Sequence, residues 1–312
     1  MGLLLLLTTI ATAAPALLPA GSAALYGGGG VSTWRWGMSG NRRDPAAIAR
    51  IDTWAGLGLG DHVQLSGGLP LVASTIAADA PFRPCPSAEE GYCRSVVSVG
   101  DAHALLHVGS RWRGLTGRVA AGPRSDAWNA ATRTRYVNVG QGTWGGVVEG
   151  SGGGQHQAIG GFVEGRYVAR LGRPVAGLEG RFPSDAVQWS AAAHGDLGAV
   201  RLQGAVHGHH QLGGVDYGPD YLQRFYDTGE RWGVVAFRQV RAEAKVSVAT
   251  SDHTGVHVTA SRAVHTLNGP RDHTDVALGA HVWMPGRRFA ELASRTPRQV
   301  PPPRSLPSRP PR

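Results

Sequence analysis

The strongest pattern in the chain is a regular alternation of apolar and polar residues on both sides of a short turn. In Val187–His194 the odd-numbered positions are apolar and the even-numbered ones mostly polar; in Val200–His207 the even-numbered positions are apolar or glycine. Successive side chains of a β-strand point to opposite faces, so each segment predicts a strand with one apolar and one polar face, joined at Gly195–Gly198. Both segments approach the roughly 9 to 11 residues that a tilted strand needs to cross a bilayer.

The same period of two residues recurs along most of the chain. The repeats are separated alternately by short turns, expected at Gly60-Asp61 and Gly150–Gly154, and by longer polar loops, which is the layout of outer-membrane barrels. We therefore predict an all-β protein, an antiparallel transmembrane β-barrel of about 10 to 12 strands that is apolar outside and polar inside. The further strand candidates are Ile51–Leu59, Val63–Val72, Asp101–Arg113, Leu115–Ala121, Tyr136–Gly150, His156–Arg170, Arg231–Val240, Glu243–Thr250, Gly255–Val264 and Val276–Val282.

Strands of a soluble β-sandwich alternate in the same way, so a second interpretation stays open. In it the chain is a secreted or periplasmic sandwich that binds carbohydrate or surfaces through exposed aromatic residues. Tryptophans at strand ends favour the barrel, because aromatic girdles are expected where a barrel meets the two membrane interfaces. The girdle candidates are Trp54, Trp112, Trp144, Trp189, Trp232 and Trp283.

The composition and the first residues place the chain outside the cytoplasm. With 46 Gly and 20 Pro in 312 residues, the chain is typical of a turn-rich β protein. Residues 1–24 have the apolar run and small residues of a secretory signal peptide, with cleavage expected near Ala23 or Ala24. We divide the rest into an N-terminal segment at 25–50, the barrel at 51–289 and a Pro/Arg-rich disordered tail at 290–312, and expect the barrel in the outer membrane of a Gram-negative bacterium.

The net charge of +9 comes mainly from the end of the chain. Residues 287–312 hold seven Arg and one acid, Glu291, which together contribute +6. A surface that reads nucleic acid gathers its basic residues on one folded face, and no such cluster occurs before Arg287. We therefore expect outer-membrane lipid and a small-molecule solute as partners, and no nucleic acid.

The only two cysteines, Cys85 and Cys93, lie in a proline-containing loop at 73–96. In an exported chain, two cysteines in one loop are most simply a disulfide that closes it. Metal ligation would need more partners than two thiols. We predict a Cys85–Cys93 disulfide in a loop on the extracellular side.

The polar face of each predicted strand would line the inside of the barrel. Acids are nearly absent from these positions, so we expect a weakly cationic lumen that favours neutral or anionic solutes, because rings of basic side chains disfavour cations. The lumen-lining candidates are Arg111, Gln188, His194, Arg201, Gln203, His207, His257, Thr259, Ser261 and His281.

Histidine and serine offer the main candidates for chemistry. His207, His209 and His210 form the densest histidine group, but no cysteine or carboxylate accompanies them at ligand spacing, and isolated pairs more often line a polar surface. The trio Ser251–His253 has the residue types of a hydrolytic triad, yet triad members usually come from separate segments. We expect no metal, no cofactor, no catalytic residue and no enzymatic activity.

Four glycine-rich segments carry a resemblance to a known family. They are GLGLGDHVQLSGGLPLV (Gly56–Val72), VGDAHALLHVG (Val99–Gly109), NVGQGTWGGVVEGSGGG (Asn138–Gly154) and LNGPRDHTDVALGAHVW (Leu267–Trp283). In this order they resemble the outer-membrane barrels of the phenol-degradation meta-pathway family, over roughly Ile51–Phe289. The resemblance implies a passive channel or uptake protein for small solutes, hydrophobic ones included. Such barrels usually end at an aromatic residue on the last strand, and the tail that follows Phe289 departs from that pattern.

Overall fold

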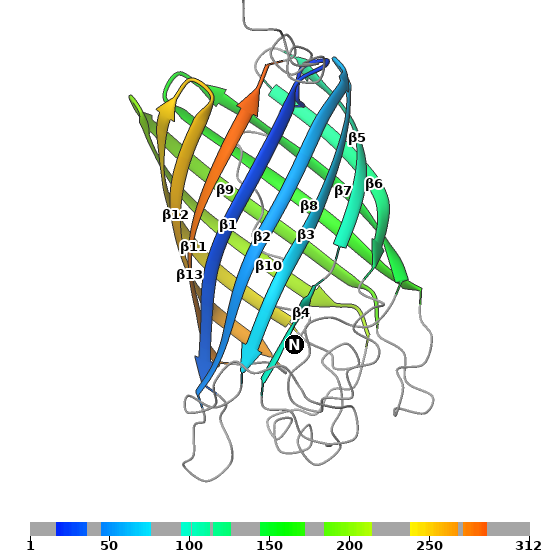
Figure 1. Ribbon diagram of the computed structural model, residues 1–312, viewed down its shortest axis with the longest axis vertical. Helices are drawn as coiled ribbons and strands as arrows, with labels where there is room; N and C mark the ends of the chain where they lie inside the picture. Colours follow the sequence, from blue (N-terminus) through cyan, green and yellow to red (C-terminus); the bar gives the residue numbers. More distant parts are fainter. Residues whose placement is uncertain are drawn as a thin grey trace, which may run out of the picture.

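The computed structural model describes residues 17–35, 45–75, 95–100, 102–112, 115–125, 144–171, 184–213, 238–267 and 271–285. These residues form one antiparallel sheet that curls into a closed barrel (Figure 1). No helix long and apolar enough to cross a membrane occurs among them. The strands are β1 (Ala23–Arg35), β2 (Pro45–Gly60), β3 (Val63–Thr75), β4 (Ser95–Val99), β5 (Ala102–Trp112), β6 (Leu115–Ser125), β7 (Trp144–His156), β8 (Ile159–Leu171), β9 (Ala186–Leu197), β10 (Val200–Gln211), β11 (Arg238–Ser251), β12 (Thr254–Leu267) and β13 (Arg271–Met284).

The barrel closes between its first and last strands. Except for β4 and β5, strands that follow one another in the sequence pair with each other, and β1 pairs with both β2 and β13, where Ala23 lies opposite Met284. Because β4 and β5 both pair with β3, they are two parts of one strand of the wall, and the barrel has 12 strands. The prediction of an antiparallel barrel of this size is therefore confirmed.

The interruption between β4 and β5 lies opposite a proline. The N–H of Gly100 donates to the carbonyl oxygen of Pro70 at 2.8 Å, so that carbonyl faces the interrupted strand. The N–H and C=O groups of one residue in a strand point to the same side. Because Pro70 has no N–H, it can accept a hydrogen bond from the interrupted strand but cannot donate one to it. The predicted strand Val63–Val72 has Pro70 near its end, whereas β3 continues to Thr75, so Pro70 lies inside the strand.

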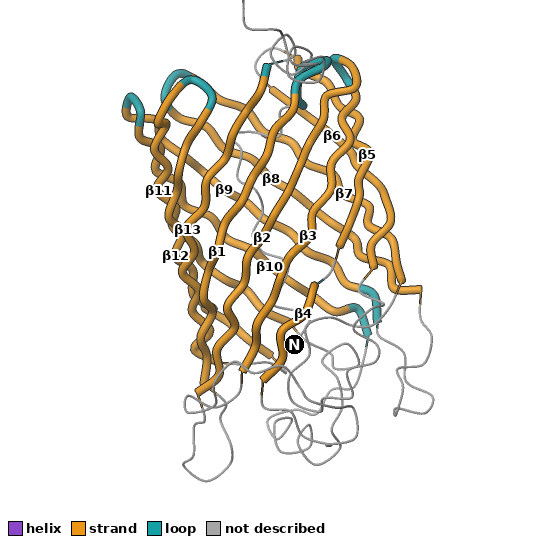
Figure 2. Tube along the Cα trace, viewed as in Figure 1, coloured by secondary structure: helices purple, strands orange, loops and turns teal. Residues whose placement is uncertain are grey.

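Tight turns gather at one end of the barrel (Figure 2). Tight turns join strands at one end, among them those at residues 61–62, 157–158, 198–199 and 252–253, and β1 begins and β13 ends there. Short turns mark the periplasmic end of an outer-membrane barrel, so we assign this end to the periplasm. The opposite end of the barrel, where β2 begins and β3 ends, is then the extracellular end. Cys85, Cys93 and the tail at 290–312 lie outside the described residues, so the disulfide and the disordered tail stay predictions.

The barrel begins earlier in the chain than the sequence analysis placed it. The predicted N-terminal segment at 25–50 is not separate from the barrel, because it holds most of β1 and the start of β2. Gly27–Gly30 has no side chains, so the alternation of apolar and polar residues did not reveal β1. The backbone of β1 nevertheless pairs with β2 on one edge and with β13 on the other. At the other boundary, β13 ends at Met284, and the predicted end of the barrel at residue 289 lies outside the described residues.

The residues just before β1 fold against the inner face of β2. The backbone N–H of Leu18 donates to Oε1 of Gln64 at 3.0 Å, and Gly58 exchanges backbone hydrogen bonds with Gly21 and Ser22. A Cβ on Gly58 would lie 2.1 Å from the carbonyl oxygen of Pro19, so this close approach requires glycine. Signal cleavage near Ala23 or Ala24, which would remove these contacts, stays a prediction.

Two turns lie later in the chain than the glycine content suggested. The predicted turn at Gly150–Gly154 is wrong, because β7 continues to His156 and the chain reverses at residues 157–158, where Gln157 has a φ of 54°. The next predicted turn, Gly195–Gly198, is shifted, since β9 runs to Leu197 and Gly198 has a φ of 65°. A tight turn needs positive φ at a particular position, and neighbouring glycines do not fix that position.

The barrel is apolar outside and polar inside. Among the described residues, 22 buried side chains are polar or charged and nine are apolar, while Leu, Val and Ile side chains are exposed on every strand from β1 to β3 and from β5 to β13. A β-sandwich shows the opposite distribution, because the apolar faces of its two sheets meet. The alternative of a soluble sandwich is therefore wrong, and the exposed apolar band matches the lipid-facing band of a transmembrane barrel.

A charge placed at mid-height on this outer face is expected to destabilise the barrel. Leu278 lies near the middle of β13 and Leu197 next to a turn, and both are exposed. We predict that Leu278→Arg lowers the free energy of unfolding in vesicles by about 2 to 4 kcal/mol. Leu197→Arg should lower it by at most about 1 kcal/mol, because the cost of a charge on the lipid face falls towards the membrane interface. Reversible urea unfolding in vesicles measures both. Equal costs for the two variants would show that the wall does not face lipid.

Candidate functional site

The luminal wall is the candidate functional site, and the predicted lumen residues lie on it as follows. Gln188, His194, Gln203, His207, His257 and Ser261 are buried on the inner face of their strands, and Arg201 and Thr259 are half-buried. His281 is exposed and borders a luminal cavity near the periplasmic end. The side chain of Arg111 lies outside the described residues.

The wall also carries acids that the sequence analysis missed. Glu149 is 2% exposed, and Glu164, Glu243 and Asp275 form ion pairs on the same face. The expectation that acids are nearly absent from the lumen is therefore wrong. Applying the two-residue alternation to β7 would have found Glu149, between the exposed Val148 and Gly150, but the predicted turn directly after it ended the pattern too early.

One cluster of charges spans β6, β7 and β8. Arg166 donates to Oε2 of Glu149 through Nη2 at 2.7 Å and through Nε at 3.1 Å, and Arg118 Nη2 donates to Oε1 at 3.3 Å. Glu164 lies within 3.8 Å of both arginines. His107 Nδ1 lies 3.8 Å from Glu149. Two guanidinium groups and two carboxylates neutralise one another, as buried charges require.

A second cluster lies on β10 to β13. Arg241 forms an ion pair with Asp275 and donates to Ser261, whose hydroxyl donates to Asp275 Oδ2 at 3.0 Å. His207 Nε2 lies 3.2 Å from a carboxylate oxygen of Glu243. A cavity of about 60 Å³ separates this cluster from the Arg50–Asp52 ion pair of β2 and is lined by both. We call the two clusters and this pair the charged belt.

A larger cavity of about 430 Å³ lies nearer the periplasmic turns, and we call it the periplasmic chamber. The rings of Tyr26 and His257 stack in its wall with centroids 5.5 Å apart and planes 14° from parallel. Its charged lining consists of Asp196, Arg201 and Lys245. Its other lining rings are Trp54, His281 and Trp283, and Leu18 also borders it.

Aromatic and imidazole rings lie close against the wall because glycines make room for them. A Cβ on Gly279 would lie 2.7 Å from the His257 ring and 2.8 Å from the Tyr26 hydroxyl, so both rings cover this glycine. The same relation joins Trp54 to Gly56 and His281 to Gly255. A ring that lies against the wall leaves the lumen wider than a ring that points to the axis.

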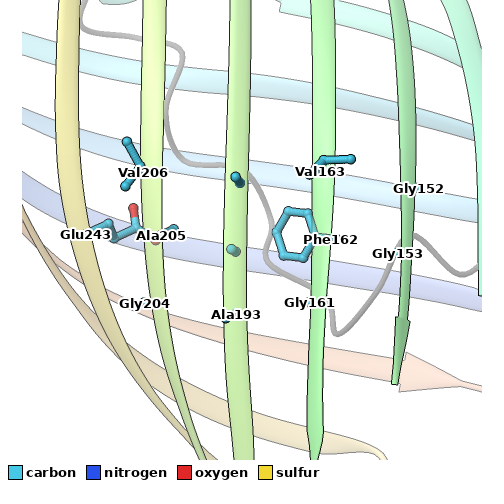
Figure 3. Close-up of a pocket in the computed structure, with 12 residues that line it drawn as sticks. Gly152, Gly153, Gly161, Phe162, Val163, Ala193, Gly204, Ala205, Val206 and Glu243 are labelled. Carbon is cyan, nitrogen blue, oxygen red and sulfur yellow. The ribbon is translucent and has the colours of Figure 1, made fainter. Parts of the chain in front are cut away.

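One section of the wall on β7 to β10 is built largely from glycine and alanine, and Phe162 supplies the one ring that lines it (Figure 3). Phe162 packs over Gly153, where a Cβ would lie 2.7 Å from the Phe162 Cβ. A hollow of about 760 Å³ borders this section, and its lining includes inward Ala205 and Glu243 and outward Val206.

The tryptophans divide between the two faces. Trp144 and Trp189 are exposed on the outer face towards the extracellular end, as a girdle requires. Trp54 and Trp283 line the periplasmic chamber, so the girdle interpretation is wrong for these two. The side chains of Trp112 and Trp232 lie outside the described residues.

The two candidates for chemistry do not assemble into a site. His207 and His209 are buried on the luminal face, but within the described residues no three His, Cys, Asp or Glu side chains are placed to hold a metal ion. In the Ser251–His253 trio, the serine hydroxyl accepts the N–H groups of His253 and Thr254, both at 3.1 Å, which caps the turn.

Comparison with known proteins finds similar folds among outer-membrane proteins. The COG4313 outer membrane channel from Pseudomonas putida F1 matches 86% of this chain and 97% of its own, with a TM-score of 0.64 and 11% sequence identity. The KdgM porin matches 83% of this chain and 98% of its own, with a TM-score of 0.46 and 4% sequence identity. The CymD monoaromatic hydrocarbon channel matches 86% of this chain and 89% of its own, with a TM-score of 0.40 and 8% sequence identity. No family model and no curated sequence matches the chain. The first likeness shows that the fold is that of an outer-membrane β-barrel.

Removing the central acid of the charged belt is expected to destabilise the barrel. Glu149→Gln leaves Arg118 and Arg166 without their shared carboxylate in a buried site, at a cost of about 3 to 5 kcal/mol. Asp196→Asn is the matched control, because its ion pair with Arg201 is roughly a quarter exposed and contributes at most about 1 kcal/mol. Urea unfolding measures both variants, and equal losses would contradict the assignment of Glu149 to a buried network.

Proposed function

We propose that the chain is a passive channel of the Gram-negative outer membrane that admits small solutes, hydrophobic ones included, and that it has no catalytic role. The observation that carries the proposal is the polar inner face behind an outer face of exposed Leu, Val and Ile side chains. A barrel that served only as an anchor would need the outer face but not buried charges along the lumen. The similar Pseudomonas putida structure is named a channel, which supports the proposal.

The wall changes its chemistry along the axis of the barrel. Near the extracellular end, the amide of Gln188 lies 3.1 Å from the imidazole of His209. The charged belt follows, and the periplasmic chamber comes last. Because the belt holds acids and bases in mutual contact, it presents little net charge to a passing solute. We therefore propose that size limits entry and that the chamber gives the final contacts.

Permeation can be measured directly in proteoliposomes. We predict that vesicles with the purified, folded full-length protein swell in glycerol and arabinose, and much more slowly in the tetrasaccharide stachyose, because the lumen is narrowed by inward side chains. Vesicles without protein and vesicles with protein boiled before reconstitution are the controls. Swelling no faster than in these controls would refute a channel.

The glycines under the luminal rings should control the rate. We predict that Gly279→Val lowers arabinose flux several-fold, because its side chain would push the rings of His257 and Tyr26 away from the wall and into the lumen. Gly204→Val is the matched control, since Gly204 lies at an outward position with nothing within 4 Å of an added Cβ. Unchanged flux in the folded Gly279→Val protein would show that this level does not limit permeation.

A further inference from the structure

We infer that residues 17–22 stay on the mature protein as part of the barrel, so that cleavage of the export signal falls before Leu17. We call these residues the inner strap. The inference concerns maturation of the chain and is independent of the proposed channel function. Its starting point is that the inner strap completes the wall where β1 begins.

The inner strap continues the hydrogen-bond ladder between β1 and β2. At this end of β1, Ala23 pairs with Leu57. Directly beyond this pair, the N–H of Gly58 donates to the carbonyl oxygen of Ser22, and the N–H of Gly21 donates to the carbonyl oxygen of Gly58, both at 2.8 Å. Ser22 is 0% exposed, so the extension is as well covered as a strand of the wall. Cleavage after Ala23, or one residue later, would remove both hydrogen bonds and leave the peptide groups of Gly58 without these partners.

Before Ser22 the inner strap forms a tight turn. The N–H of Ser22 donates to the carbonyl oxygen of Pro19 at 3.0 Å, and the Ser22 hydroxyl donates to the same oxygen at 2.6 Å. Gly21 has a φ of 70°, a conformation that glycine adopts without strain. The turn lays Leu18 and Pro19 on the inner face of β2, where both contact Gly58.

The wall has a matching recess for the inner strap. Gly58 is buried on the inner face, and a Cβ there would lie 2.1 Å from the carbonyl oxygen of Pro19 and 2.6 Å from that of Leu18. On β3 the side chain of Gln64, which is 2% exposed, accepts a hydrogen bond from the N–H of Leu18 at 3.0 Å. Buried polar side chains are rarely left without partners. A recess and a buried acceptor serve a segment that stays, whereas a leader removed during export makes no demand on the wall.

The inner strap also forms part of the lumen. Leu18 borders the periplasmic chamber together with Trp54. A Cβ on Gly56 would lie 3.1 Å from Cδ1 of Leu18, so this side chain rests against β2 as well. Removal of the inner strap would therefore open the periplasmic chamber on its β2 side.

The sequence before the inner strap offers two cleavage sites that leave it intact. Signal peptides end in a small-residue pattern of the A-x-A type after their apolar run. The run Leu3–Ile10 is followed directly by the triplet Ala11–Ala13 and then by the triplet Ala14–Ala16, and both have alanine at their first and last positions. Cleavage after one of these triplets gives a mature chain that begins at Ala14 or at Leu17.

N-terminal sequencing tests the inference directly. The chain is expressed with its own leader in a Gram-negative host, and the protein purified from the outer membrane is sequenced from its N-terminus and weighed intact by mass spectrometry. We expect the first residue to be Ala14 or Leu17, and any first residue up to Leu17 supports the inference because it keeps the inner strap. A first residue at Leu18 or later would overturn it.

A second measurement tests whether the inner strap is seated, and it does not depend on export. The full-length chain is refolded in detergent, its folding is verified by the change of gel mobility on boiling, and cleavage by elastase within residues 17–22 is followed by intact mass. Gly58→Val leaves no room for Pro19, so this variant should be cut on the order of tenfold faster than wild type, because proteolysis follows the population of the open state.

Gly60→Val is the matched control on the same face of β2. An added Cβ at Gly60 has nothing within 4 Å, so this variant should resist elastase as wild type does. Equal rates of cleavage in wild type and Gly58→Val, or in Gly58→Val and Gly60→Val, would overturn the inference. Neither measurement uses permeation, so the proposed channel function is tested separately by the swelling of vesicles.

Discussion

The structure depends on one constraint, which is that a bilayer offers no hydrogen-bond partners to the backbone. Every N–H and C=O inside the hydrocarbon must pair within the protein, and a sheet can meet this demand only by closing on itself. The pairing of β1 with β13 provides the closure. Once the sheet is closed, alternate side chains are forced to opposite sides, so lipid requires an apolar outer set and the lumen can hold a polar inner set.

The inner set then has to satisfy its own charges. Glu149 is held by Arg118 and Arg166 from the two neighbouring strands, and Asp275 by Arg241 two strands away. Such pairs hold the wall together across strands, because each contact joins residues far apart in the sequence. The periplasmic chamber differs from the charged belt, because its rings lie over glycines of the wall and leave a cavity in the lumen.

The sequence predicted the parts of the fold that depend on side-chain alternation. In β9, β10 and β12 the apolar and polar sets were assigned to the correct faces, because their outward positions carry Val, Leu or Trp. β1 was missed where glycine removes the alternation, and the end of β7 was misplaced because glycines within a strand resemble a turn. Among the glycines of β7, Gly153 instead makes room for Phe162 on β8.

The arrangement of the candidate site could not be read from alternation at all. Which residues meet across the wall depends on the register between strands. A shift of one strand by any even number of residues keeps every side chain on the same face, so alternation does not determine the register. Glu149 lies opposite Arg166 because β7 and β8 pair in the register that also places Gly150 opposite Gly165. The sequence of neither strand reveals this register by itself. The periplasmic chamber depends on still more register relations, since its lining comes from seven strands, β1, β2 and β9 to β13.

Closure between the first and last strands also removes any structural distinction between a beginning and an end of the wall. Ala23 and Met284 are direct partners across the seam, so their Cα atoms lie only about 4.5 to 5.5 Å apart. A short linker could join these two residues, and new termini could be opened at any tight periplasmic turn without losing a ladder. The barrel is thus defined by the cyclic order of its strands, and this order does not depend on which strand is synthesised first.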